Sequence, residues 1–123
     1  MIGLLDTNVA LYLLGGRLAE PLPVGNYGVS VITEMELLAW PFLTRGEEEK
    51  VRELLRRLTL CELSASIRSR AVTLRREHNL KLPDPVVCGT ALEYGIELWT
   101  NDRSLAKVPS LVCRSVRLSV EPT

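Results

Sequence analysis

Short apolar runs alternate with helical patterns along the chain. Apolar runs that end abruptly at a polar residue are typical of buried strands in a parallel sheet. Apolar residues that recur at i, i+3, i+4 and i+7 instead predict amphipathic helices. The expected strands are 1–5, 27–32, 59–62, 96–100 and a final strand, with room for a bend, within 111–118.

Residues that cap or end helices define the expected helices between these strands. Glycine ends two of them, at Gly15 and Gly95, and Pro41 stops a third. Ser64 is in a position to cap a fourth. The expected helices are 8–14, 33–40, one that is clearly periodic from residue 47 to about 58, 64–79, 82–94 and a short turn over 102–107.

The alternation of strands and helices predicts an α/β fold with a mostly parallel sheet covered on both faces. The sequence contains no internal repeat, low-complexity tract or obvious linker. A chain of 123 residues is long enough to bury a core without disulfides or a structural metal. We therefore expect residues 1–123 to form a single domain.

Composition adds three constraints. Fifteen basic and fifteen acidic residues cancel, which weighs mildly against a tight, non-specific nucleic-acid binder unless the acids are concentrated in one site. The odd number of cysteines, without a C-x-x-C motif and with His78 as the single histidine, makes a disulfide framework or a zinc site improbable and suits a reducing cytoplasm. The N-terminus does not resemble a secretory signal, and the longest uncharged stretch, 21–33, is too short to cross a membrane.

Four acidic residues lie where strands end or helices begin. Asp6 directly follows the first strand, Glu36 lies one helical turn after the second, Asp84 opens a helix, and Asp102 follows the fourth strand. In a parallel α/β sheet, ligand sites form beyond the carboxyl ends of the strands, so these acids are expected at one edge. Clustered carboxylates favour a hard cation between them, which predicts Mg²⁺ or Mn²⁺.

Each acid also has a purely structural explanation. Asp6, Asp84 and Asp102 stand at plausible helix N-termini, where aspartate caps free backbone N–H groups. Thr33 and Glu36 match a capping box, in which Glu36 would reach back to the Thr33 amide. From spacing alone, a metal site and a set of helix caps remain about equally supported.

Three segments bear on the choice between a metal site and helix caps: LLDTNVALYLL, VSVITEMELL and LPDPVVCGTALEYGIELWTND. Together they resemble the successive motifs of PIN-domain proteins, especially the VapC-like toxins of bacterial toxin–antitoxin pairs, which favours the metal site. The resemblance covers nearly the whole chain apart from residues 45–80, where only helical character matches. It implies a PIN-like three-layer α/β/α fold with four to five strands.

Residue by residue, the resemblance assigns the family's four acids to Asp6, Glu36, Asp84 and Asp102. Glu34 competes with Glu36, but the family's acid comes three residues after the threonine, which favours Glu36. The sequence departs from the family pattern at Pro85, where a small residue is more common, and at Trp99, where an aliphatic residue is usual. Residues beside the acids are expected to orient them or a metal-bound water: Thr7, Asn8, Thr100 and Asn101.

The resemblance implies an Mg²⁺- or Mn²⁺-dependent endoribonuclease, the toxin of a pair, with a cognate antitoxin and a homodimeric state. Apolar residues over 9–14 and 37–43 are expected mostly in the core, with any exposed remainder forming a groove for an amphipathic partner segment. Two alternatives keep the fold: a catalytically silent interaction module, and an RNA-processing nuclease without an antitoxin. A phosphatase with a D-x-D motif would need an acid where the chain has Asn8.

Overall fold

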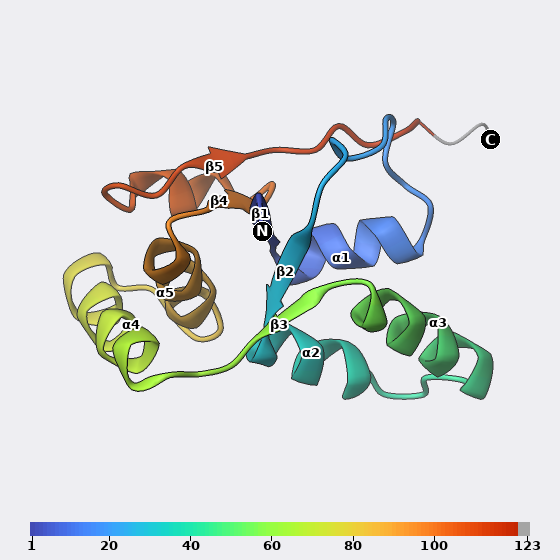
Figure 1. Ribbon diagram of the computed structural model, residues 1–123, viewed down its shortest axis with the longest axis horizontal. Helices are drawn as coiled ribbons and strands as arrows, with labels where there is room; N and C mark the ends of the chain where they lie inside the picture. The colour runs from blue at the N-terminus through green and yellow to red at the C-terminus, as the bar shows by residue number, and fades with distance from the viewer. Residues whose placement is uncertain (121–123) are drawn as a thin grey trace.

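The computed structural model describes residues 1–120, in which five short strands form one fully parallel sheet. The strand order is β3-β2-β1-β4-β5, with β1 in the middle (Figure 1). This confirms the expected fold class. The strands are β1 (Gly3–Leu5), β2 (Tyr27–Ser30), β3 (Thr59–Cys61), β4 (Glu97–Trp99) and β5 (Cys113–Arg114).

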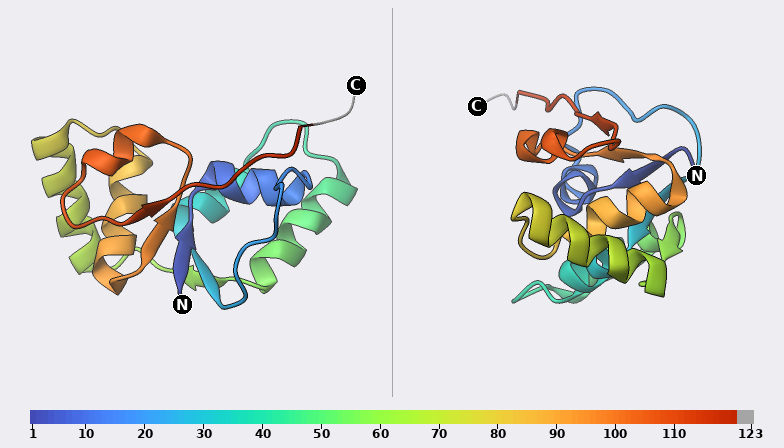
Figure 2. Two further views of the ribbon diagram at one scale, coloured as in Figure 1. Left: turned by 90° about the horizontal axis from the view of Figure 1, so that it is seen from above. Right: turned by 90° about the vertical axis from the view of Figure 1, so that its left-hand side faces the viewer.

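Helices cover both faces of the sheet, so the architecture has three layers (Figure 2). Apolar residues of α4 and α5 pack on one face and those of α1 and α3 on the other, while α2 follows β2 directly. The helices are α1 (Thr7–Leu14), α2 (Val31–Leu38), α3 (Arg45–Arg56), α4 (Ala65–His78), α5 (Asp84–Tyr94) and the 3-10 helix η1 (Arg103–Lys107).

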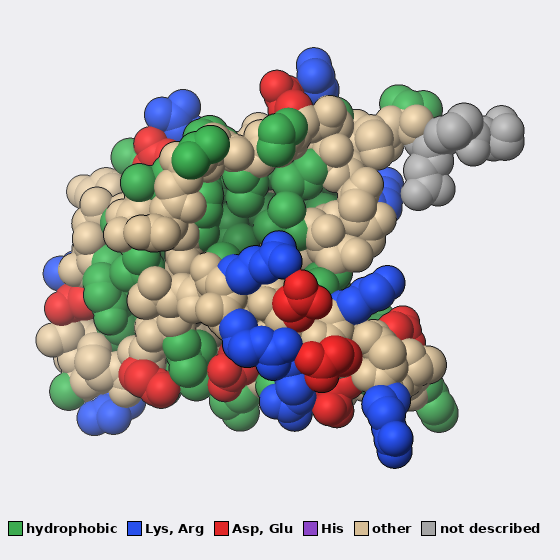
Figure 3. All heavy atoms as spheres, turned by 45° about the vertical axis from the view of Figure 1, so that its right-hand side comes forward, with side chains coloured by type: hydrophobic (Ala, Val, Ile, Leu, Met, Phe, Trp, Pro, Cys, Tyr) green, Lys and Arg blue, Asp and Glu red, His purple; other side chains and the backbone are tan. Residues whose placement is uncertain are grey.

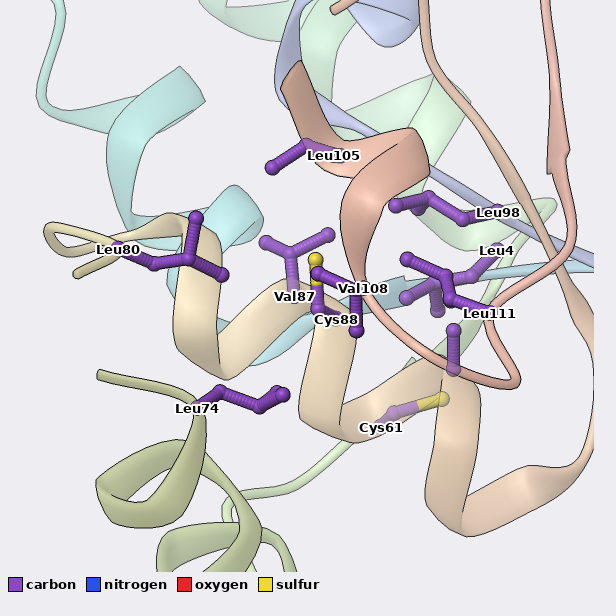
Figure 4. Close-up of a cluster of buried hydrophobic side chains, with 11 residues drawn as sticks. Leu4, Cys61, Leu74, Leu80, Val87, Cys88, Leu98, Leu105, Val108 and Leu111 are labelled. Carbon is purple, nitrogen blue, oxygen red and sulfur yellow. The ribbon is translucent and has the colours of Figure 1, made fainter. Parts of the chain in front are cut away.

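The hydrophobic core is divided by the sheet, because successive side chains of a strand point to opposite faces. Leu4 and Leu98 are fully buried among residues of α4, α5 and η1, including Leu105 (Figure 4). Leu5 points the other way and packs with Val9 of α1. The central strand β1 is therefore buried on both sides, which explains why residues 1–5 form a continuous apolar run.

The helix after β2 begins earlier than the sequence predicts. It begins at Val31 rather than at Thr33, because the Ser30 hydroxyl accepts the Ile32 N–H and caps it. The alternative explanation of Glu36, a capping box with Thr33, is therefore wrong. The described chain does form a capping box at the start of α3, between Thr44 and Glu47.

The register of β1 and β4 places polar residues side by side at the carboxyl edge of the sheet. Leu5 pairs with Trp99, so the next residues, Asp6 and Thr100, leave the two strands next to each other. Asp6 N–H donates to the Trp99 carbonyl at 3.0 Å, which keeps this point of the chain in the sheet. No helix within residues 1–120 is long and apolar enough to span a membrane.

Candidate metal-binding site

Asp6, Glu36, Asp84 and Asp102 line one pocket of about 400 Å³. They come from four different elements: the end of β1, the middle of α2, the first residue of α5 and the residue before η1. We call this cavity the acidic pocket. Its other lining residues are Thr7, Asn8, Leu11, Leu37, Ala39, Trp40, Pro41 and Pro83.

Asp6 is the most enclosed of the four acids, with 7% of its surface exposed. Its Oδ1 accepts the Thr7 N–H at 2.8 Å, and its Oδ2 accepts the Thr100 hydroxyl at 2.7 Å. The same Thr100 oxygen accepts the Asp102 N–H at 3.0 Å. One buried hydroxyl therefore ties the Asp6 side chain to the backbone that carries Asp102.

Glu36 is held by α1 rather than by its own helix. Its Oε1 accepts the Thr7 hydroxyl at 2.6 Å, and Thr33 Oγ1 lies 3.0 Å from Thr7 Oγ1. Thr33 is fully buried, so this chain of hydroxyls fixes α2 against the start of α1. Glu34 is absent from the lining of the acidic pocket, as the two-residue offset on the helix predicts.

Asp84 differs from the other acids because no hydrogen bond within the described residues holds its carboxylate. It is the first residue of α5, after Pro83, and no side chain caps this helix. Within residues 1–120 the Asp84 carboxylate accepts no hydrogen bond. Burial raises the pKa of Asp84 above its ordinary value, and the charges of Asp6, Asp102 and Glu36 raise it further.

Asp102 does have the structural role that its position predicts. Its Oδ1 accepts both the Ser104 N–H at 2.9 Å and the Ser104 hydroxyl at 2.7 Å, which caps η1. Helix capping therefore accounts for Asp102 and partly for Asp6. It accounts for neither Glu36 nor Asp84.

The donor set of the acidic pocket fits a hard divalent cation, since all four ionisable ligands are carboxylates. As they stand, no three of the acidic, histidine or cysteine side chains within residues 1–120 are arranged to hold an ion. Three of the carboxylates instead accept hydrogen bonds from the hydroxyls of Thr100, Thr7 and Ser104. For three or more of these carboxylates to bind one ion, their side chains, which already line the same cavity, must move closer together.

The sequence profile of the PIN domain matches residues 3–111, which is most of the chain. The chain belongs to the PIN domain family.

The solved structures that resemble this PIN domain include toxin–antitoxin complexes. A chain of a toxin–antitoxin complex from Klebsiella pneumoniae is 33% identical, with a TM-score of 0.76 over 89% of this chain and 95% of that one. VapBC2 from Rickettsia felis, bound to a promoter DNA fragment, has 20% identity and a TM-score of 0.78, covering 95% of this chain and 100% of that chain.

DNA-bound VapBC from Salmonella typhimurium also has 20% identity, with a TM-score of 0.75 over 94% of this chain and 98% of that chain. At 20% identity, the Rickettsia and Salmonella structures support the fold alone. No curated protein matched the chain.

The four residues expected to assist the acids divide into three groups in this PIN domain. Thr7 and Thr100 donate hydrogen bonds to Glu36 and Asp6. Asn8 lines the acidic pocket. Asn101 instead forms two hydrogen bonds with the Val116 backbone: its Nδ2 donates to the carbonyl at 3.0 Å, and its Oδ1 accepts the N–H at 2.7 Å. It lines a neighbouring cavity.

The sequence did not reveal two residues that contact side chains of the acidic pocket. Thr33 was considered only as a helix cap, although its hydroxyl lies next to that of Thr7. Ser104 holds the Asp102 carboxylate. The Asp-x-Ser spacing was a usable signal for Ser104, because aspartate commonly accepts the N–H two residues ahead. The Thr33–Thr7 contact joins residues 26 positions apart and had no local signal.

Trp99 and Pro85, the two departures from the family pattern, are both accommodated. A Cβ on Gly3 would lie 2.6 Å from the Trp99 ring, so the glycine in β1 leaves room for this indole. Tyr27 meets the same ring edge-on, at 6.2 Å between centroids. Pro85 is buried in the first turn of α5, where its missing N–H breaks no helical hydrogen bond.

A side-chain nucleophile for covalent catalysis is not evident in the described part of the PIN domain. Cys88 lies on α5, one turn after Asp84, but it is fully buried. Burial raises the pKa of its thiol to about 12, so the thiolate is not formed at neutral pH. His78 is not among the residues that line the acidic pocket.

The arginines of α3 do not form a free basic surface. On the face shown in Figure 3, basic and acidic side chains are intermingled. Arg52 and Arg56 of α3, and Arg57 directly after it, each pair with a glutamate of α3, at 3.2, 2.9 and 2.9 Å. Such pairing is typical of a solvated helix face rather than of a phosphate-binding surface.

Proposed function

We propose that this PIN domain, acting as a single unit over residues 1–123, is an endoribonuclease that depends on Mg²⁺ or Mn²⁺. The observation that supports this most is the convergence of four carboxylates from four elements in one pocket. Their mutual repulsion raises the pKa of Asp84, in addition to the effect of burial. A cation at this point would relieve that repulsion. Membership of the PIN family supports nuclease activity in general.

In this proposal Asp6, Glu36 and Asp84 hold the ion, and Asp102 contacts it directly or through water. The ion would supply an activated water and withdraw negative charge from the scissile phosphodiester. Thr100 keeps the Asp6 carboxylate aimed at the pocket, since its hydroxyl donates to Oδ2 at 2.7 Å. Thr7 does the same for Glu36, donating at 2.6 Å.

We further propose that the protein is the toxin of a type II toxin–antitoxin pair and acts in the cytoplasm. The relatives named above were solved as such complexes. In this chain the rim of the acidic pocket is apolar: Trp40 and Pro41 line it, and Trp40 is 59% exposed. Phe42, two residues further, is 99% exposed. An amphipathic antitoxin segment would cover these side chains, and a basic residue of that segment would neutralise the carboxylates.

A homodimer is the remaining part of this proposal. Partly buried apolar side chains lie between α1, α3 and the segment after β5, and Figure 3 shows hydrophobic atoms gathered in a hollow beside α3. A second copy of the chain would cover this face. The side chains concerned are Leu13, Leu22, Leu55, Leu58 and Val116.

The test is cleavage of a fluorescent single-stranded RNA by the purified chain. We expect cleavage with Mg²⁺ or Mn²⁺, loss of cleavage with EDTA, and inhibition after co-expression with a small antitoxin gene that lies next to the gene of this chain. RNA binding or partner binding without cleavage under any metal would favour a silent interaction module. Cleavage with no antitoxin gene nearby would favour an RNA-processing nuclease.

A further inference from the structure

A second cavity adjoins the acidic pocket. It has a volume of about 540 Å³, within the usual range for small-ligand sites. Asp102 lines both cavities, so they meet at this residue. We call it the Arg103 cavity; its lining residues are Thr100, Asn101, Asp102, Arg103, Ala106, Cys113, Ser115 and Val116.

Arg103 is the single basic residue among those that line the two cavities. Its side chain is exposed and forms no ion pair within the described residues 1–120, whereas Arg70 and Arg114 pair with glutamates. The four carboxylates of the adjacent acidic pocket repel a polyanion such as RNA. A free guanidinium at the border supplies the opposite charge where a phosphate chain would enter.

A buried side chain and two hydrogen bonds hold the walls of the Arg103 cavity in place. Arg103 begins η1, which is anchored by the fully buried Leu105 (Figure 4). On the other side, Asn101 clamps the Val116 backbone through two hydrogen bonds. Ala106, Cys113 and Val116 offer an apolar wall, and Ser115 adds a hydroxyl. Such a mixture suits a base and ribose next to a phosphate.

We propose that the Arg103 cavity binds the nucleotide next to the scissile phosphate of single-stranded RNA, with the Arg103 guanidinium on its phosphate group. This inference rests on the proposed nuclease function, because the Arg103 cavity would hold the part of the RNA that leads into the acidic pocket. It explains how a chain with no net charge would hold RNA beside a cluster of acids.

The experiment measures fluorescence anisotropy of a fluorescein-labelled RNA hexanucleotide in EDTA, so that binding is recorded without cleavage. The dissociation constant is determined over a series of salt concentrations from low ionic strength upwards. Each phosphate contact adds about 0.7 to the slope of log affinity against log salt for single strands. Arg103→Ala should lower that slope by about 0.7 and weaken binding roughly tenfold, as expected for loss of a charge-assisted contact.

Arg103→Lys should retain most of the slope, and Arg68→Ala is the matched control. Arg68 is also an exposed arginine without an ion pair among residues 1–120, but it lies on α4 and lines neither cavity. As a second readout, the hexanucleotide should shift the backbone amide resonances of Ala106 and Ser115 in the wild type and not in Arg103→Ala.

The outcomes separate this inference from the proposed function. Equal slopes for Arg103→Ala and Arg68→Ala, or no binding at low salt, would overturn the cavity assignment even if metal-dependent cleavage is observed. An Arg103-dependent slope together with no cleavage under any metal would support the cavity and remove the nuclease.

Discussion

Replacing Thr100 by valine should reveal how strongly one buried hydroxyl holds the acidic pocket together. Valine keeps the shape of threonine but can neither donate to Asp6 Oδ2 nor accept the Asp102 N–H, which lie 2.7 and 3.0 Å from Thr100 Oγ1. Thr100 and Asp6 are 3% and 7% exposed, so water cannot easily replace the lost partner. A hydrogen bond to a charged group contributes about 1.5–3 kcal/mol, and the second bond adds about 0.5–1.5 kcal/mol. We therefore expect the free energy of unfolding to fall by about 2–4 kcal/mol, a large part of the roughly 5–15 kcal/mol that such a domain has.

Two matched variants isolate the effect of the hydroxyl. Thr90→Val makes the same chemical change at a buried site of α5, where the hydroxyl donates only to the Val86 carbonyl of its own helix. It should cost at most about 1 kcal/mol, because that carbonyl remains in the helical ladder. Thr100→Ser keeps both hydrogen bonds and should lose only about 0.8 kcal/mol for the missing methyl group.

The assay is urea unfolding at pH 7 in EDTA, followed by far-ultraviolet circular dichroism. In addition, Thr100→Val should weaken Mn²⁺ binding by roughly 10- to 100-fold, as is common when a residue that orients a ligand is removed. If Thr100→Val costs no more than Thr90→Val, the hydroxyl does not hold Asp6 as described and this reasoning fails.

Three further predictions concern single acids and the partner surface. In EDTA at pH 7, Asp84→Asn should raise the free energy of unfolding in urea titrations. Burial and the other acids hold the pKa of Asp84 above its ordinary 3.8, so the folded wild type loses stability as the pH rises through this raised pKa. The gain should vanish below pH 3.8, where Asp84 is protonated in both states; a gain that persists there would contradict the electrostatic cause. Glu36→Gln should abolish RNA cleavage and Glu34→Gln should not, and the reverse result would show that Glu34 is the working acid. Light scattering should show a dimer at micromolar concentration. Phe42→Ser, at an exposed residue that does not line the acidic pocket, should weaken antitoxin capture without changing the cleavage rate. A monomer, or unchanged capture, would remove the corresponding partner claim.

The sequence predicts the fold well because its strongest signals are local. A charge-free run such as 1–5 can be buried on both sides only in a sheet covered by two helical layers. The N-cap of α4 at Ser64 and the αL residue that ends α5, Gly95, are likewise encoded by their own side chains. The start of α2 could not be read so directly, because Ser30 and Thr33 are both good caps and the choice depends on where β2 leaves the sheet.

The candidate site is only partly encoded in local sequence. The positions of the four acids follow from strand ends and helix starts, so their convergence was predictable. Which of Asp6, Glu36 and Asp84 also acts as a cap was not. The distinction depends on contacts such as Thr7 to Glu36 and Thr100 to Asp6, which join residues 29 and 94 positions apart. Asn101 shows the opposite error, since it stands next to Asp102 in sequence but binds Val116.

Binding of Mn²⁺ is the most direct test of the claim that the acidic pocket is a metal site. Electron paramagnetic resonance at neutral pH would count free Mn²⁺ during titration of the wild type, Asp84→Asn and the Glu34→Gln control. We predict saturable binding to the wild type and to Glu34→Gln, competition by Mg²⁺, and a loss of at least tenfold in affinity for Asp84→Asn, the expected cost of removing a charged ligand. Equal Mn²⁺ affinity in all three proteins, or no saturable binding to the wild type, would contradict the account.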